Sequence, residues 1–176
     1  MLQNERENRH QRVMDAVGKM MTAARTAPKG KGIDIIEIMA VEGSDLQTLS
    51  ERMREFGEQN GKKFFFRDAD NVLKAEAVLL IGTHQKKQVL DCSYCGFSTC
   101  NDKPDATPCA INSVDVGIAI GSACAMASDM RLDTRVMFSA GYAAKALDWL
   151  DGCDTIIAIL ISASSKNPFF DRQFQL

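Results

Sequence analysis

Four cysteines lie close together near the middle of this chain: Cys92, Cys95, Cys100 and Cys109. Their spacing is C-x2-C-x4-C-x8-C, and two further cysteines complete the six in the sequence. Thiolates are soft ligands, and four of them suit either zinc or an iron–sulfur cluster. A closely spaced pair of cysteines can also act as a dithiol or disulfide device. The spacing therefore predicts a metal centre or a redox device.

The uneven spacing favours an iron–sulfur cluster. A structural zinc site usually takes its cysteines from two short-spaced pairs, whereas this stretch has one pair and two single cysteines. A [4Fe–4S] cubane is wider than one ion, and a loop with uneven spacings can reach its four corners. Gly96 lets the backbone approach closely, and Pro108 fixes the approach of Cys109. We expect a [4Fe–4S] cluster on the four cysteines; [2Fe–2S], zinc on the same cysteines and a dithiol device stay open.

Composition predicts an ordinary globular protein. The chain has 176 residues, of which 45% are apolar and 25% charged, with a net charge of −2. This size suits one domain, residues 1–176, and the charge gives no reason to expect nucleic acid or a membrane as partner. The polar start lacks a secretory signal, and the apolar run 116–127 falls short of the ~20 residues that span a bilayer. We expect a cytoplasmic protein, in which closely spaced cysteines indicate metal or catalysis.

Periodicity predicts the elements that position the cysteines. Apolar residues at helical spacing over 13–24 predict a first helix, and a second opens at Ser44 with a capping box to Gln47. A brief helix is expected to start at Asp68, and a further helix at Asn112 or Ser113 and run to about residue 130. A last helix is expected over 141–150. Strands are expected over 33–41, 64–66, 77–82, 136–138 and 155–161.

These elements predict an α+β fold. The expected architecture is a layered sandwich in which helices flank a central sheet of about four or five strands. The runs 77–82 and 155–161 are continuously apolar, so both should be buried on both faces. The cysteine loop, residues 91–109, then lies between a buried strand and a helix rich in small residues.

Several other residues have simple expectations. Cys124 and Cys153 suit small buried positions rather than ligands. No catalytic nucleophile–base pair is evident, and the two histidines are isolated from metal-ligand spacing. Glycine and alanine at four-residue steps predict close packing against the sheet or another helix, a dimer contact, or a smooth surface beside a planar cofactor. Aromatic residues in the tail predict docking onto this subunit or a second copy. The residues concerned are Gly117, Gly121 and Ala125 on the helix, and Phe169, Phe170, Phe174 and Leu176 in the tail.

The residues of the cysteine stretch resemble a known family. Residues 91–100, followed by Pro108 and Cys109, are similar to the loop of small uncharacterised proteins that contain a ferredoxin domain. The similarity continues in Asp-Val-Gly-Ile-Ala at 115–119, Arg-Val-Met-Phe-Ser at 135–139 and Lys-Asn-Pro-Phe-Phe-Asp-Arg at 166–172. The resemblance implies an iron–sulfur redox protein with an electron-transfer or oxidoreductase role.

A more distant resemblance is to the flavin-dependent nitroreductases. Their first helix is followed by an Ala-Pro loop that contacts flavin, and the residues of this chain that would correspond are Thr26, Ala27, Pro28, Lys29 and Gly30. The sequence lacks the Arg-x-Ser-x-Arg that binds the flavin phosphate in that family, with Arg9 and Arg12 as the only nearby substitutes. The resemblance implies a layered fold, a homodimer formed through the central helix at 116–129, and FMN as a second candidate cofactor.

Overall fold

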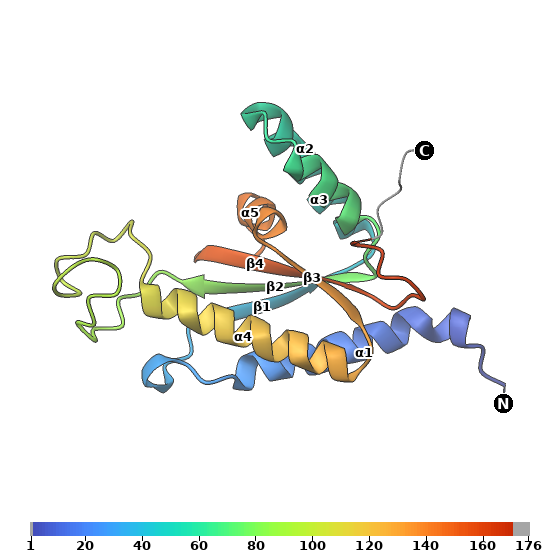
Figure 1. The fold of residues 1–176 in the computed structure, drawn as a ribbon, viewed down its shortest axis with the longest axis horizontal. Helices are drawn as coiled ribbons and strands as arrows, with labels where there is room; N and C mark the ends of the chain where they lie inside the picture. The colour runs from blue at the N-terminus through green and yellow to red at the C-terminus, as the bar shows by residue number, and fades with distance from the viewer. Residues whose placement is uncertain (1, 171–176) are drawn as a thin grey trace.

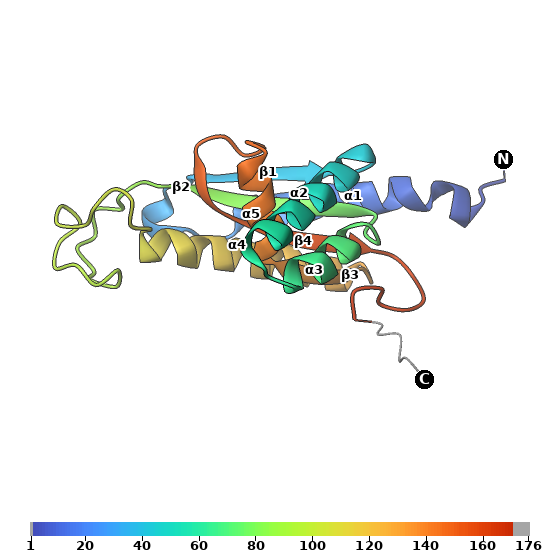
Figure 2. The same cartoon turned by 90° about the horizontal axis from the view of Figure 1, so that it is seen from above.

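The computed structural model describes residues 2–170 as three layers, with a four-stranded sheet between two layers of helices (Figure 1). Helices α1 and α4 cover one face of the sheet, and α2, α3 and α5 cover the other (Figures 1 and 2). The helices are α1 (Glu5–Thr26), η1 (Gly30–Gly32), α2 (Ser44–Asn60), α3 (Phe64–Val72), α4 (Ala110–Asp129) and α5 (Phe138–Ala146). The strands are β1 (Ile36–Val41), β2 (Ala77–His84), β3 (Asp133–Met137) and β4 (Cys153–Ser162). The predicted layered α+β sandwich is confirmed.

The two most apolar strands lie at the centre of the sheet. The strand order is β1-β2-β4-β3, and every neighbouring pair is antiparallel. Residues 77–83 of β2 are all buried, as the continuous apolar run predicts, because helices cover both faces. The pairing of β2 with β4 shifts register between Thr83 and His84, where the cysteine loop begins.

The first helical layer is α1 packed beside α4. The predicted apolar face of α1 is confirmed, since Val13, Val17 and Met20 are buried. The inner face of α4 consists of alanines at 119, 123 and 127, each fully buried. In residues 2–170, α4 is the one helix whose length and hydropathy would let it cross a membrane, and 33% of that stretch is buried in the fold.

The outer face of α4 corrects one prediction. Close packing of Gly117 and Gly121 within the chain is wrong, because a Cβ added at either position would meet no atom within 4 Å. Ala125 is exposed on the same helix, and Val114 and Ile118 are 51% and 40% exposed. The small residues of α4 therefore leave a flat apolar surface on the outside of the described chain.

The second helical layer corrects three more predictions. Residues 64–66 form the start of α3 rather than a strand, because Phe65 is buried beside Phe56 of α2 and Tyr142 of α5, and Phe64 stacks on it with ring centroids 4.7 Å apart. Asp68 therefore lies inside a helix instead of capping one, and Ser139 donates a 2.7 Å hydrogen bond to its Oδ2. The predicted capping box also fails, since Gly43 is the N-cap of α2 and makes no side-chain cap bond.

The boundaries near the C-terminal half differ by a few residues. Helix α4 begins at Ala110 with Cys109 as N-cap, ahead of the predicted Asn112 or Ser113, and α5 begins at Phe138, which was expected in a strand.

Of the tail residues, Phe169 is buried and its carbonyl accepts a 2.6 Å hydrogen bond from Arg135, which confirms docking onto this chain at that residue. Phe170 is 60% exposed and lies under the Arg135 guanidinium, whereas Phe174 and Leu176 lie outside the described residues.

Candidate metal centre

The connection between β2 and α4, residues 85–109, contains the predicted loop 91–109 and is called the cysteine loop from here on. It extends from one end of the molecule (Figure 1). It contains no helix or strand, and Val89, Asp91, Ser93 and Gly96 adopt left-handed backbone conformations, with φ between 48° and 88°. Closely spaced left-handed residues curl the backbone and can turn successive N–H groups towards a common point. This curled backbone is suited to surround an anionic group.

The four thiols of the loop differ in exposure. Cys100 and Cys109 are buried, whereas Cys92 and Cys95 are half-buried. All four are free. Within residues 2–170, no three His, Cys, Asp or Glu side chains are arranged so that they could hold a metal ion. The sequence prediction that these four cysteines act together therefore rests on their donor chemistry and on their shared loop.

Asp91 and Cys100 make two reciprocal hydrogen bonds across the loop. The Asp91 N–H donates to the Cys100 sulfur at 3.4 Å, and the Cys100 N–H donates to Asp91 Oδ1 at 2.6 Å. A backbone N–H that donates to sulfur stabilises a thiolate and tunes a metal bound to it. The Asp91 side chain holds this arrangement, a role that the spacing of the cysteines does not reveal.

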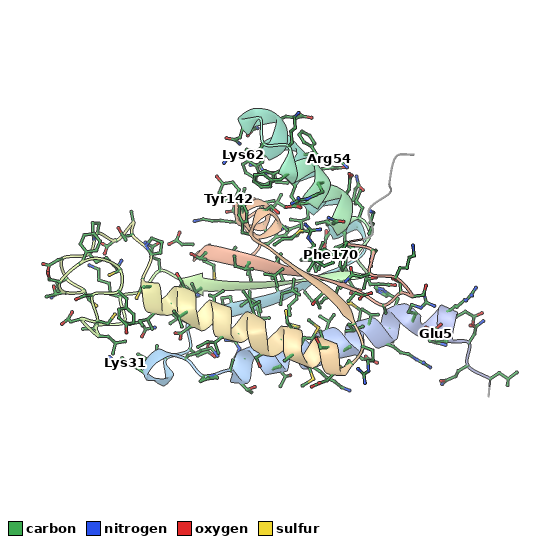
Figure 3. The ribbon with its side chains drawn as sticks, viewed as in Figure 1. Glu5, Lys31, Arg54, Lys62, Tyr142 and Phe170 are labelled. Atoms are coloured by element: carbon green, nitrogen blue, oxygen red, sulfur yellow. The ribbon has the colours of Figure 1, made fainter. Side chains whose placement is uncertain are left out.

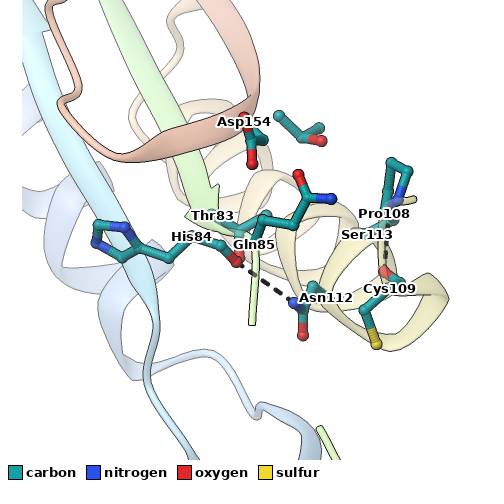
Figure 4. A pocket seen from close by; sticks show the side chains of 9 residues that line it. Thr83, His84, Gln85, Pro108, Cys109, Asn112, Ser113 and Asp154 are labelled. Carbon is teal, nitrogen blue, oxygen red and sulfur yellow. Dashed lines mark hydrogen bonds between the residues drawn. The ribbon is translucent and has the colours of Figure 1, made fainter. Parts of the chain in front are cut away.

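Cys109 lies at the N-terminus of α4 (Figure 4). The free N–H groups and the dipole of a helix N-terminus favour negative charge there, as a thiolate ligand requires. A small hollow beside it is lined by the end of β2, the start of β4 and the first turn of α4. Residues from Thr83 to Gln85 line one side of this hollow, and Asp154 and Thr155 another.

The other two cysteines have the opposite character. Burial raises the pKa of the Cys124 thiol, and burial together with Glu37 raises the pKa of Cys153 to about 11. A thiol with a raised pKa stays protonated near neutral pH and is a poor metal ligand. The expectation that these two are packing residues is supported, and the four loop cysteines remain the candidate ligands.

The segment expected to contact flavin uses its polar groups internally. The Lys29 side chain is 4% exposed, and its Nζ donates to the carbonyls of Arg25 at 2.7 Å and Ala27 at 2.9 Å. The Gly30 N–H donates to Asp115 Oδ1 at 2.9 Å. These donors hold the end of α1 and attach it to α4, so they are not free for a flavin phosphate. By its donor groups this segment does not fit FMN, whereas the cysteine loop fits a soft metal.

Comparisons with known proteins identify the family, although the family match includes only Cys109 of the four loop cysteines. A protein of Archaeoglobus fulgidus, described only as an uncharacterized protein, is 39% identical over 182 residues, with 98% of each chain covered. Residues 105–172 match the family described as "Uncharacterized protein containing a ferredoxin domain". A ferredoxin domain indicates an iron–sulfur cluster.

Solved structures share the fold at low sequence identity. A nitroreductase with bound FMN from Bacteroides fragilis aligns with a TM-score of 0.63 and 12% identity, over 91% of this chain and 82% of that one. A nitroreductase family protein from Clostridium novyi gives 0.58 and 16%, over 89% and 76%. The chain spans only 58% of the hypothetical oxidoreductase YcnD from Bacillus subtilis, at 0.55 and 16% identity. The fold is nitroreductase-like, and fold and family together indicate a redox role.

Proposed function

This chain belongs to the family of uncharacterized proteins that contain a ferredoxin domain, and we propose that it is a redox protein with one [4Fe–4S] cluster on Cys92, Cys95, Cys100 and Cys109. The observation that carries the proposal is that one curled loop contains four free thiols. The other two thiols are packed into the fold, and burial raises the pKa of each.

The chain's own residues would each contribute to such a site. Cys100 and Cys109 are largely shielded from water, and the Asp91 N–H already donates to the Cys100 sulfur. The N-terminus of α4 would favour the negative charge of the Cys109 thiolate. When bound, an iron–sulfur cluster supplies one-electron transfer. Half-exposed Cys92 and Cys95 would leave one side of the site open to an electron donor or acceptor.

Metal analysis of anaerobically purified or reconstituted protein tests the proposal. We expect about four irons per chain and a broad absorption near ~400 nm that dithionite bleaches. Colourless protein that carries one tightly bound zinc would overturn the redox proposal. It would support the alternative, a binding or scaffold protein in which a structural zinc fixes the same loop.

A flavin-dependent oxidoreductase is the second candidate, favoured by the likeness to the FMN-bound nitroreductase structure. The hydrogen bonds that Lys29 Nζ and the Gly30 N–H donate within the chain argue against this candidate, because these donors are not free to bind a flavin phosphate. Flavin fluorescence in the supernatant of heated protein decides between them. Release of about one FMN per chain would favour the nitroreductase-like chemistry, and its absence after incubation with FMN would exclude it.

We also propose that the protein is a cytoplasmic homodimer formed through the outer face of α4. Val114 and Ile118 are exposed beside Gly117 and Gly121, where open space would accept a second helix. All six cysteines are free, which suits a reducing compartment. Sedimentation equilibrium should give twice the chain mass for the wild type and a single chain mass for Gly121→Arg. A monomeric wild type at micromolar concentration would contradict the dimer.

A further inference from the structure

Three segments that are far apart in the sequence meet in a polar network at the base of the cysteine loop. We call its members Gly30, Lys31, Gln88, Asn112 and Asp115 the base network. Gln88, Asn112 and Asp115 are each at most 4% exposed. They come from the loop that precedes Cys92 and from the first two turns of α4, which follow Cys109.

Asn112 connects the two ends of the cysteine loop. Its Nδ2 donates to the Lys86 carbonyl at 2.7 Å and to the His84 carbonyl at 3.4 Å, the second of which is drawn in Figure 4. Its Oδ1 accepts a 2.9 Å hydrogen bond from Gln88 Nε2. Asn112 stands three residues after Cys109, so one side chain fixes the start of the loop to the helix that follows its last cysteine.

The turn at η1 is the third segment of the base network, and it contacts both the start of the cysteine loop and α4. Lys31 Nζ donates to the Gln88 carbonyl at 3.2 Å, and the Gly30 N–H donates to Asp115 Oδ1 at 2.9 Å. Figure 3 shows Lys31 at the end of the molecule that carries the cysteine loop. A Cβ at Gly30 would lie 2.7 Å from Ile111 Cγ2, so the turn sits closely against α4.

The network keeps polar groups buried at a cost to stability. Gln88 Oε1 and Asp115 Oδ2 are buried and accept no hydrogen bond from the described residues. A buried acceptor without a donor is destabilising, and apolar side chains would avoid that cost. We therefore read these side chains as fixing the position of the cysteine loop rather than as stabilising the fold.

We propose that Asn112 is a positioning residue for the cluster. It fixes residues 84–88, which precede Cys92, to the first turn of α4, which follows Cys109, so that the two ends of the loop are already joined before the metal enters. This inference rests on the proposed function. Ordering the loop beforehand removes part of the entropy that binding would otherwise have to supply.

The test compares three variants of the reconstituted full chain. Asn112→Ala removes three hydrogen bonds, and Gln88→Leu removes one with little change of volume. Ser50→Ala is the matched control: its buried hydroxyl donates to the Ala69 carbonyl in the opposite layer. We measure the rate at which a chelator removes iron, the midpoint potential, and amide hydrogen exchange of residues 85–91 in the metal-free protein.

Loss of an outer-shell partner typically lowers metal affinity about 10- to 100-fold. Compared with the wild type, Asn112→Ala should therefore lose iron at least ~10-fold faster, show a shifted midpoint potential and exchange the amide hydrogens of residues 85–91 faster. Gln88→Leu should show smaller changes of the same kind, and Ser50→Ala should show none. If Asn112→Ala does not fold, Gln88→Leu decides by the same criteria.

The inference would be overturned if Asn112→Ala and Gln88→Leu released iron at the wild-type rate and kept the wild-type midpoint potential. It would also be overturned if Ser50→Ala showed changes as large as theirs. A wild-type chain that takes up no iron would instead overturn the proposed function. In that case hydrogen exchange of the metal-free variants still judges the base network, and unchanged exchange in Asn112→Ala would refute it.

Discussion

The layered core and the cysteine loop of this protein are built by different kinds of interaction. In the core, the sheet residues and the helix faces that cover them exclude water almost completely, as the fully buried Leu79, Leu80 and Ile159 show. The loop has no regular secondary structure and leaves Val89 and Tyr94 66% and 77% exposed. It is held by a few hydrogen bonds at its base and between Asp91 and Cys100.

This difference separates stability from function. Burial of apolar surface stabilises the core, roughly in proportion to the area removed from water. The loop buries little and gains its order from polar contacts and, in our proposal, from a metal cluster. Changes in the core should therefore lower the free energy of unfolding and leave the cluster unaltered in molecules that fold, whereas changes in the loop should do the reverse.

The largest effect is expected in the core for Gly141→Ala. A Cβ at Gly141 would lie 1.9 Å from the carbonyl oxygen of Ile156, a backbone atom of β4 that cannot turn aside. Overpacking of this kind should cost about 3 kcal/mol or more of unfolding free energy in urea denaturation. Gly18→Ala on the exposed side of α1, where nothing lies within 4 Å, is the matched control and should be neutral or gain up to about 1 kcal/mol. Equal stability of the two variants would contradict the packing.

A smaller loss is expected for Asp68→Asn. Its carboxylate is buried, accepts from Ser139 and pairs with Arg67 at 2.8 Å and Arg135 at 3.6 Å. Removing a charge from a buried hydrogen-bonded group should cost about 2 kcal/mol in the same denaturation measurement, with the iron content per folded chain unchanged. Loss of iron in this variant would show that core and loop are coupled.

The loop should respond to Asp91→Ala. The change removes the acceptor of the Cys100 N–H and loosens the N–H that faces the Cys100 sulfur. We expect iron release to a chelator to be about 10-fold faster. The urea midpoint of the metal-free chain should move little, because Asp91 packs against no part of the core. A large fall in that midpoint would contradict the separation of the two regions.

The smallest effect concerns His10, which bridges α1 to two other segments. Hydrogen bonds that its ring donates to the carboxylates of Glu42 and Glu76 raise its pKa, so the folded state holds its proton more tightly than the unfolded state. Its stabilisation is fully present below the unfolded pKa of about 6.5 and is lost as the pH rises through the folded pKa. His10 is exposed, so the contribution should be under about 1 kcal/mol. Denaturation of His10→Gln at pH 5.5 and pH 9 should show a deficit only at the lower pH; an equal deficit at both would refute the pairing.

Local pattern predicts the core well and the loop poorly. The burial of the apolar run 77–82 and the helical spacing of Val13, Val17 and Met20 are confirmed, and 155–161 is a strand as predicted, although Thr155 and Ile157 are only partly buried. The three phenylalanines at 64–66 predict a strand because aromatic residues favour strands, but Phe65 packs against Phe56 of α2 and Tyr142 of α5, and the segment is helical.

In the candidate site, too, the sequence predicts some features and misses others. Cysteine spacing points to the candidate ligands, because four closely spaced soft donors indicate a metal without reference to distant parts of the chain. The role of Asn112 could not be predicted, since its partners lie 24 to 28 residues away and the pattern suggested only a helix cap. The outward direction of Gly117 and Gly121 likewise depends on which face of α4 meets α1 and the sheet.

The most direct test of the central claim compares iron bound by cysteine variants that are reconstituted side by side. Cys95→Ala should lose most of its iron and its absorption near ~400 nm, whereas Cys124→Ala should match the wild type at about four irons per chain. Full iron retention in Cys95→Ala, or loss in Cys124→Ala, would contradict the assignment of the cluster to the loop.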